Sequence, residues 1–494
     1  DIVSNSLEEH SVFFGTGPGT FMFNWSKYHG PELNQTAFWN TRFDRAATYI
    51  QTLLAGTGLF GLIAWGLFFL AIVGVSFLHI VKKRLEKDWL MSFAFFIPWM
   101  MTSLLFFLYS ANLTLLFSFF LFAGLLGALC LEKEMVISLK KDARLRFLFS
   151  AKFVVASVFF VFLIFVTSQR YFAEASFAKA VRLDRQGADI QEVLDELDHA
   201  ASIVRFNDIY YRNLAQAFLQ ELAGELEDIK PGEAIDPKQG QYIQALTAAS
   251  VNAAIEATEL SSSNVLNWLM LGSIYRELIG VVTDADQSAQ NSFARALHLE
   301  PSNPSHHAEL ARLHMIIAES IRPQIESENP EVANAATTEL EQHLKAAEDL
   351  LSRAIELKPD YAPAHYELGI LFDRQGRLDD AIGKMEGVAT YNQLDVGVAF
   401  QLGMLYLRRD VPGDLGRAQV QLEKTVTYAP AYSNARWFLA SIYEQQGNFD
   451  AAIEQVEKVR EYNSENELIN ERLESLKSGK AASELPPPII EEIE

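Results

Sequence analysis

Three long stretches of this sequence are apolar and contain no charged residue: Leu53–Ile80, Trp89–Tyr109 and Leu113–Leu131. A helix needs about 20 apolar residues to cross the hydrocarbon core of a bilayer, and each of these stretches reaches that length. A fourth stretch, Val154–Ser168, is shorter, but its apolar face extends back to Phe147. The sequence therefore predicts four membrane-spanning helices over residues 51–169. The alternative, a buried helix of a soluble core, stays open mainly for the fourth stretch.

The loops between these stretches differ in charge, and this difference predicts their orientation. Basic residues gather in segment 82–88, between the first two stretches, and in segment 133–152, between the last two. Segment 110–112, between the second and third stretches, carries no charge. Because basic loops stay in the cytoplasm, residues 1–50 and the chain after about residue 170 are expected on the outer side of the bacterial cytoplasmic membrane.

The charge of the chain changes sharply near residue 170. Residues 1–170 contain 14 basic and 10 acidic residues, whereas residues 171–494 contain 27 basic and 53 acidic ones. This acidity argues against a nucleic-acid partner, since phosphates require cationic surfaces. The single cysteine, Cys130, excludes an internal disulfide and a cysteine-based zinc site.

The second half of the chain contains a repeat with a period near 34 residues. Leu368-Gly369 and Phe372 recur as Leu402-Gly403 and Tyr406, and again as Leu439-Ala440 and Tyr443. Small residues recur where two helices of each repeat would cross, and prolines follow the second helices; these positions are Ala381, Ala418, Ala452, Pro301, Pro359 and Pro430. This pattern predicts stacked pairs of helices, because one pair alone cannot bury both of its faces.

The repeat resembles the tetratricopeptide repeat in its period and in its Leu-Gly, Tyr and Ala positions. The resemblance predicts an all-α solenoid over residues 265–478, preceded by degenerate repeats over residues 170–264 and containing about six helix pairs in all. An insertion near Ile321–Thr338 contains two prolines, so we expect a protruding loop there. Residues 479–494, rich in proline and acidic residues, are expected to be disordered. A protein partner is expected on the concave face.

Chemistry is expected in the first fifty residues. Gly15-Thr16-Gly17-Pro18-Gly19 predicts a tight turn whose backbone can approach a ligand closely. No Gly-Lys-Ser/Thr follows, so the turn is not a P-loop. The segment 1–50 is therefore treated as an extracytoplasmic loop with a candidate binding turn.

Arg42, Asp44 and Arg45 stand just before the first apolar stretch. Two guanidinium groups suit a phosphate or pyrophosphate, which arginine grips through paired hydrogen bonds. Asp44 could orient one of them or act as a base. The alternative is that these arginines only anchor a helix at the interface.

The turn and the helix that follows resemble the C-terminal part of the O-antigen ligase and polymerase superfamily. The resemblance is carried by Gly15–Phe21, by Tyr49-Ile50-Gln51 and by Ala55, Gly58 and Gly61, and it covers residues 12–130. It implies a polytopic, metal-independent glycosyltransferase of the GT-C type without a cofactor, acting on a polyprenyl-diphosphate-linked glycan. Some relatives carry tetratricopeptide repeats after the last membrane helix, in the same order as here.

Under this resemblance, Arg42, Asp44, Arg45 and His29 are the candidate catalytic residues. Gly15, Gly17, Pro18, Gly19, Tyr28 and Tyr49 are the candidate substrate-binding residues. Family members commonly carry His-Asn where this chain has Ala46-Ala47, so His29 is considered as a substitute for that histidine.

Two function hypotheses follow. The first is a glycan ligase that transfers glycan to an acceptor in envelope polysaccharide or glycoprotein synthesis. The second is a non-enzymatic, membrane-anchored scaffold that binds proteins through its repeats. The sequence begins at Asp1 without a methionine, and we expect a processed chain or a fragment whose N-terminal helices are missing.

Overall fold

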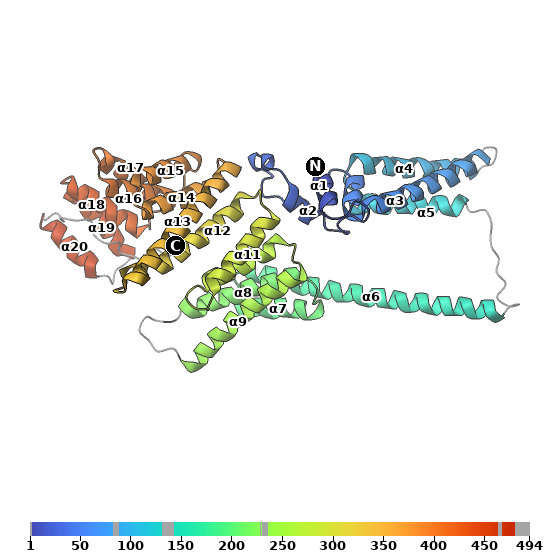
Figure 1. Ribbon diagram of the computed structural model, residues 1–494, viewed down its shortest axis with the longest axis horizontal. Coiled ribbons are helices and arrows are strands. Elements are labelled where there is room, and N and C mark those ends of the chain that lie inside the picture. Colours follow the sequence, from blue (N-terminus) through green and yellow to red (C-terminus); the bar gives the residue numbers. More distant parts are fainter. Residues whose placement is uncertain are drawn as a thin grey trace. The chain divides into compact units, whose positions relative to one another are not determined.

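The computed structural model describes residues 2–82, 88–130, 143–227, 229, 236–462 and 467–479. Every regular element in these ranges is a helix, which confirms the all-α prediction (Figure 1). Contacts divide the chain into two compact units, Asp1–Ser302 and Asn303–Glu494. Each unit is described separately below.

The first unit begins with a short helical segment and three apolar helices. The short elements are α1 (Ile2–Glu9), α2 (Phe21–Tyr28) and the 3-10 helix η1 (Pro31–Gln35), and the apolar helices are α3 (Tyr49–Lys82), α4 (Asp88–Leu108) and α5 (Leu113–Cys130). Helices α3, α4 and α5 pack around Trp99, Phe106, Phe119 and Leu126, which are almost fully buried. Many of their remaining apolar side chains are exposed.

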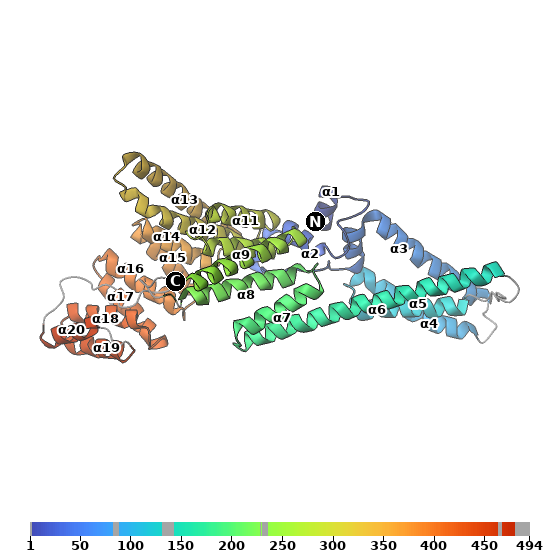
Figure 2. The same ribbon diagram turned by 90° about the horizontal axis from the view of Figure 1, so that it is seen from below.

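Helix α6 (Ala143–Arg185) is one unbroken helix of 43 residues that changes character along its length (Figure 2). Its apolar part, which includes Phe153 and Phe165, is exposed. Further along, Ala173 and Ala180 are completely buried against α7 (Ile190–Ile203). The boundary predicted at residue 170 thus falls inside this helix.

With α6, the described residues of the first unit contain four helices that are long and apolar enough to cross a membrane. This agrees with the four stretches found in the sequence. That they span a bilayer, and that they form a GT-C arrangement, remain predictions. The basic loops that predicted the orientation lie mostly in segments 83–87 and 131–142, outside the described residues.

The rest of the first unit consists of helix pairs. The helices are α8 (Asp208–Glu227), α9 (Pro237–Leu260), α10 (Val265–Glu277) and α11 (Ala285–Leu299). Helix α8 packs on α9 and α10 packs on α11, while the end of α6 packs on α7. The described residues of the segment 170–264 therefore form helix pairs, and the first pair takes one of its helices from α6. That these pairs are degenerate repeats remains a prediction.

The second unit continues the same pattern. It contains α12 (Pro304–Ile321), the 3-10 helix η2 (Arg322–Glu326), α13 (Pro330–Leu357), α14 (Ala362–Arg374), α15 (Leu378–Tyr391), α16 (Val396–Arg409), α17 (Asp414–Tyr428), α18 (Ser433–Gln445), α19 (Phe449–Tyr462) and α20 (Glu467–Lys477). The pairs are α12/α13, α14/α15, α16/α17 and α18/α19, and α20 packs on α19.

The side chains of the second unit confirm the repeat register. Ala381, Ala418 and Ala452 are fully buried where paired helices cross. A Cβ atom at Gly369 would lie 2.9 Å from Met385, and one at Gly403 would lie 2.9 Å from Leu422. Both glycines therefore allow the first helix of a pair to approach the second closely.

The prediction of a protruding loop over Ile321–Thr338 is wrong for most of that segment, which is helical. Helix α12 runs to Ile321, η2 follows it, and α13 already begins at Pro330. Asn329 caps α13 by accepting a hydrogen bond from the Glu331 backbone N–H at 3.0 Å. Proline fits the first turn of a helix because its missing N–H has no partner there in any case. The insertion thus lengthens the helix pair. Of the tail predicted to be disordered, residues 480–494 lie outside the described residues.

Candidate functional site

The glycine-rich turn docks onto an interruption in α3. Gly58 has φ 64° and ψ −163°, so the helix is broken inside the apolar segment. The break leaves backbone groups of α3 without partners in their own helix, and the N-terminal segment supplies them. Thr16 N–H donates to Ala55 O at 3.0 Å and Gly17 N–H to Gly56 O at 2.9 Å. In the other direction, Leu59 N–H donates to Val12 O at 2.9 Å.

The glycines of the turn are explained by this contact. Gly15 has φ 70°, and a Cβ atom there would lie 2.5 Å from Ala55 O. A Cβ atom at Gly58 would lie 2.4 Å from the Phe13 backbone. Gly17 and Gly19 also have positive φ, and Pro18 lies against Gly56. Gly15 and Gly17 therefore lie against the backbone of α3, whereas a Cβ atom at Gly19 would meet nothing within 4 Å.

Polar side chains hold the turn from within. Thr16 Oγ1 and Thr20 Oγ1 lie 2.7 Å apart, and Asn24 Nδ2 donates to Thr16 Oγ1 at 2.8 Å. Thr20 Oγ1 donates to Gly17 O at 2.7 Å. Asn24 is buried, so this network fixes α2 to the turn.

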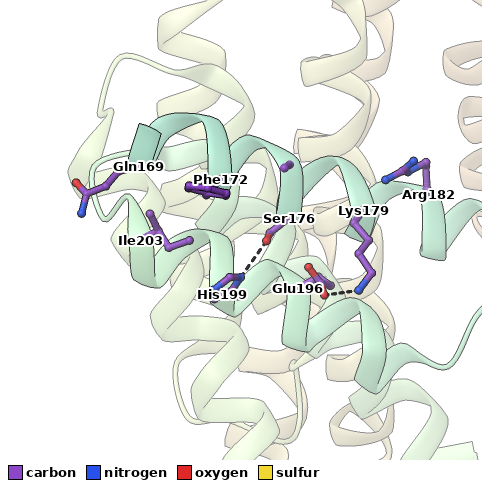
Figure 3. Close-up of a pocket in the computed structure, with 9 residues that line it drawn as sticks. Gln169, Phe172, Ser176, Lys179, Arg182, Glu196, His199 and Ile203 are labelled. Carbon is purple, nitrogen blue, oxygen red and sulfur yellow. Dashed lines mark hydrogen bonds and ion pairs between the residues drawn. The ribbon is translucent and has the colours of Figure 1, made fainter. Parts of the chain in front are cut away.

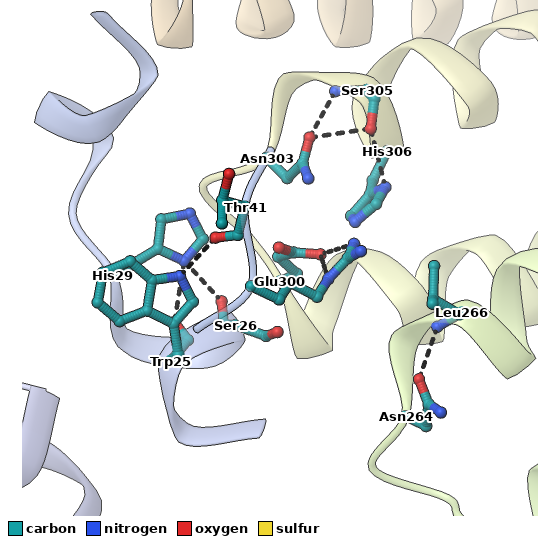
Figure 4. A network of polar contacts seen from close by, with 11 residues as sticks. Trp25, Ser26, His29, Thr41, Asn264, Leu266, Glu300, Asn303, Ser305 and His306 are labelled. Atoms are coloured by element: carbon teal, nitrogen blue, oxygen red, sulfur yellow. Dashed lines mark hydrogen bonds and ion pairs between the residues drawn. The ribbon is translucent and has the colours of Figure 1, made fainter. Parts of the chain in front are cut away.

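Tyr28 and His29 end α2 and have structural contacts. The Tyr28 hydroxyl and the Lys27 ammonium both donate to the Glu9 carboxylate. Burial, aided by this hydrogen bond, raises the pKa of Tyr28. His29 is buried and stacks on Trp25, and its Nδ1 lies 2.9 Å from Trp25 O and 3.1 Å from Ser26 O (Figure 4). Nδ1 therefore donates to the last carbonyls of α2.

Arg42 forms an ion pair with Glu300, a buried glutamate near the C-terminal end of the first unit. Its Nε and Nη2 lie 3.1 and 2.5 Å from Glu300 Oε2, at the end of α11 (Figure 4). The Glu300 side chain is 3% exposed and that of Arg42 is 17% exposed. Nearby, Asn34 Nδ2 donates to Ser302 O at 2.8 Å. These contacts attach the N-terminal loop to the end of the helix pairs.

Arg45 and Asp44 form a pair of their own. Arg45 Nε and Nη2 donate to the two Asp44 carboxylate oxygens at 2.7 and 2.6 Å. Arg45 Nη1 donates to Ala111 O, between α4 and α5, at 3.0 Å. Both side chains are accessible, with 43% of Arg45 and 65% of Asp44 exposed. The hydrogen bond from Arg45 lowers the pKa of Asp44, which makes Asp44 a poor proton acceptor.

Tyr49, the first residue of α3, packs in the apolar cluster. Its ring centroid lies 4.6 Å from that of Phe106, and its N–H donates to Tyr109 O at 3.0 Å. Its contacts are thus those of a core residue.

The candidate residues therefore have separate partners. The glycine turn meets α3, Arg42 meets Glu300, and Arg45 meets Asp44 and Ala111. Sequence reasoning missed Glu300, Glu9 and Ala111, for which local sequence gave no signal. Among the described residues, no group of three or more His, Cys, Asp and Glu side chains could hold a metal ion.

The repeat region carries a cavity of about 540 Å³ in the second unit. It lies between α15, α16 and α17 and includes Glu386, Leu394, Tyr406 and Tyr428 in its lining. Leu394 and Tyr428 are exposed, and Tyr406 donates to Glu386 Oε1 at 2.5 Å. The cavity thus offers an apolar and a polar wall to a ligand.

The comparisons with known proteins concern the repeats. Family models of the tetratricopeptide repeat match residues 341–391 and 412–471. Among curated proteins, none matches the sequence. Similar solved structures include a tetratricopeptide-repeat protein from Parabacteroides merdae, with 16% identity over 62% of this chain and 99% of that chain and a TM-score of 0.39. A thermophilic repeat protein from Thermus thermophilus has 17% identity, coverage of 46% and 98% and a TM-score of 0.31.

The structure of yeast Tom70 is also similar, with 16% identity over 64% of this chain and 59% of that chain and a TM-score of 0.42. The repeat assignment rests on the family models together with the observed helix pairs. The C-terminal region of this chain therefore contains tetratricopeptide repeats.

Proposed function

We propose that this protein is a membrane-anchored tetratricopeptide-repeat protein that binds a protein partner at the outer face of the cytoplasmic membrane. One observation carries the proposal: α6 passes without a break from an exposed apolar segment into the first helix pair. A continuous helix transmits position and orientation, so the repeats would be held at the membrane surface. Extended repeat surfaces are used for binding.

The cavity between α15, α16 and α17 is the proposed partner site. Exposed Leu394 and Tyr428 supply apolar contacts there, and Lys424 and Glu386 supply polar ones. Exposed aromatic side chains contribute strongly to protein interfaces. The excess of acidic over basic residues after residue 170 favours a basic or uncharged partner.

Crosslinking in native membranes tests this proposal. A photoreactive amino acid at Tyr428 should capture a discrete protein, and Leu394→Asp should reduce that product at least about tenfold, as expected for the loss of about 1.4 kcal/mol of binding energy. Tyr462, which is exposed on α19, is the matched control position and should not give the same product. Equal capture at both positions would contradict the proposed site.

A second candidate function is glycan transfer from a polyprenyl-diphosphate donor. The observation that favours it is the exposed Arg45, which is fixed by Asp44 and Ala111 at one end of the apolar helices. In this function, an acceptor hydroxyl would attack the anomeric carbon of the donor and break its C–O bond to the diphosphate. Arg45 would stabilise the departing diphosphate, and the hydroxyl proton would pass to water or to the diphosphate. Arg42 is a weaker candidate because Glu300 already neutralises it.

Substitution of Arg45 tests the second function. Lysine keeps the charge but loses the planar fork that binds a diphosphate, so both Arg45→Lys and Arg45→Ala should lower glycan transfer. The loss of one charge-assisted contact corresponds to about 1–3 kcal/mol. Arg353→Lys, an exposed arginine in the second unit, is the control. Suppose that both Arg45 variants transfer glycan normally and that the amount of protein in the membrane is unchanged. Arg45 would then be excluded as a residue that binds the diphosphate donor.

A further inference from the structure

Phe206 is exposed at the tip of the turn between α7 and α8. The turn joins α7 to α8, and 88% of the Phe206 side chain is exposed. Asn207 caps α8 by accepting a hydrogen bond from the Ile209 N–H at 3.1 Å, and the Tyr210 N–H donates to Asn207 O at 3.2 Å. The exposure of Phe206 is therefore a property of an ordered turn.

This turn lies level with the end of the apolar part of α6. Ile203, the last residue of α7, and Gln169 of α6 line the same cavity (Figure 3). A second cavity, of about 560 Å³, is lined by Val166 of α6 together with Phe206. Val166 belongs to the last turn of the stretch predicted to cross the bilayer. Phe206 thus lies where that stretch would leave the hydrocarbon core.

The side chains around the turn match the chemistry of a membrane interface. Arg170 and Arg205 line the same cavity as Phe206 and are exposed. Within the described ranges, neither arginine forms an ion pair, and the nearby Glu174 accepts a hydrogen bond from Tyr210. Tyr171 and Phe172 on α6 are also exposed, at 70% and 60%. Aromatic rings are enriched at the headgroup level of a bilayer, and a guanidinium group binds phosphate oxygens through paired hydrogen bonds.

We infer that the turn between α7 and α8 is a second membrane contact of this protein. Phe206 inserts its ring into the interfacial region, and Arg170 and Arg205 bind the phosphates of anionic lipids. The inference rests on the proposed membrane anchoring by α6. It adds a second point of attachment, which fixes the rotation of the first helix pair about the axis of α6.

Site-specific fluorescence on the full chain in vesicles tests this contact. The chain has a single cysteine, Cys130, so Cys130→Ala gives a background for one new cysteine at a time. Phe206→Cys is labelled with an environment-sensitive dye in vesicles of phosphatidylcholine with phosphatidylglycerol. Headgroup-labelled nitroxide lipids should quench this dye at least about twofold, and Arg205→Gln should reduce the quenching in these vesicles but not in pure phosphatidylcholine.

Two control positions in the same unit separate the possible outcomes. Phe160→Cys reports on the middle of the apolar part of α6 and should be quenched by nitroxides deep in the acyl chains. Val281→Cys is the second control, and Val281 lies after the end of α10. The start of α10 lies beside the start of α8, because Asn264 Nδ2 and Asn267 Nδ2 donate to Asp208 Oδ2 at 2.7 and 2.8 Å. Val281, 65% exposed, therefore lies at the opposite end of these helices and should not be quenched.

The pattern of quenching distinguishes failure of the second membrane contact from failure of the anchoring by α6. If the Phe160 label is quenched and the Phe206 label is not, the second contact is wrong while the anchoring by α6 stands. If the Phe160 label is not quenched by any lipid, the proposed anchoring itself fails. If a water-soluble quencher cannot reach the Phe206 label and lipid nitroxides do not quench it, a protein covers the turn and the lipid contact is overturned.

Discussion

Gly15 and Gly58 have positive φ angles, which residues with a side chain rarely adopt. The backbones of these two glycines are in close contact at the break in α3. The sequence predicted a tight turn at Gly15 whose backbone can approach a ligand closely, and in the structure this turn packs against the backbone of α3. It did not predict that the approaching group is the chain's own helix. Gly58 is one of several glycines in the first apolar stretch, and nothing in the local sequence distinguishes a glycine that breaks a helix from one that packs within it.

Substitution by alanine should separate these two kinds of glycine. Gly15→Ala and Gly58→Ala each force a Cβ atom to within 2.5 and 2.4 Å of backbone atoms, respectively, and each also strains φ, so we expect a loss of at least about 1–3 kcal/mol. Gly66→Ala is the matched control in the same helix, because its Cβ atom would meet nothing within 4 Å. Thermal unfolding in detergent measures the effect, and equal melting temperatures for all three variants would argue against the docked turn.

At the scale of the elements, the repeat period predicted the helix pairs because the Leu-Gly and Ala positions are fixed by helix crossings. Two features could not be predicted in this way. The fourth apolar stretch and the first helix of the helix pairs are one element, α6, because apolar and amphipathic helices join without any break in backbone geometry. The prolines after Ile321 indicated a loop, yet Pro330 starts a helix, since proline fits both structures.

The pair α12/α13 contains two histidines whose contact predicts a pH dependence. His314 Nδ1 and His343 Nδ1 lie 2.7 Å apart, so one must donate and the other must accept. Burial, together with the neighbouring His343, lowers the pKa of His314 from 6.5 to about 4. A lowered histidine pKa stabilises the folded state above the unfolded-state pKa, and this stabilisation is lost as the pH falls from about 6.5 towards 4.

The contribution of His314 is at most about 3 kcal/mol, since one pKa unit corresponds to about 1.4 kcal/mol. The urea concentration at which half of the repeat region is unfolded should therefore decrease as the pH is lowered from 7.5 to 4.5. His314→Gln keeps a hydrogen-bonding side chain but cannot be protonated in this range, and it should flatten the dependence. An unchanged pH profile in this variant would show that other groups cause the acid sensitivity.

On the scale of the whole molecule, the contact between Arg42 and Glu300 joins residues separated by 258 positions. Sequence reasoning identified Arg42 because it stands beside Arg45 and Asp44 before an apolar helix. It had no means to find Glu300, because the partner of a long-range ion pair depends on how the helix pairs stack. The two arginines therefore had the same interpretation in the sequence and have different surroundings in the folded unit: Arg42 is half-buried and paired with a distant glutamate, and Arg45 is accessible and paired with its neighbour Asp44.

A double-mutant cycle tests this difference between the two arginines. Arg42→Gln removes the arginine that pairs with the Glu300 carboxylate, which is 3% exposed, so we expect a loss of about 3 kcal/mol in unfolding free energy. Glu300→Gln in the same chain should restore much of that loss, because the buried charge is then removed as well. Arg45→Gln should cost no more than about 1 kcal/mol, since its pair with Asp44 is largely exposed. Additive effects of Arg42→Gln and Glu300→Gln would mean that the two residues do not interact, and Arg42 would then be free to serve the donor site in place of Arg45.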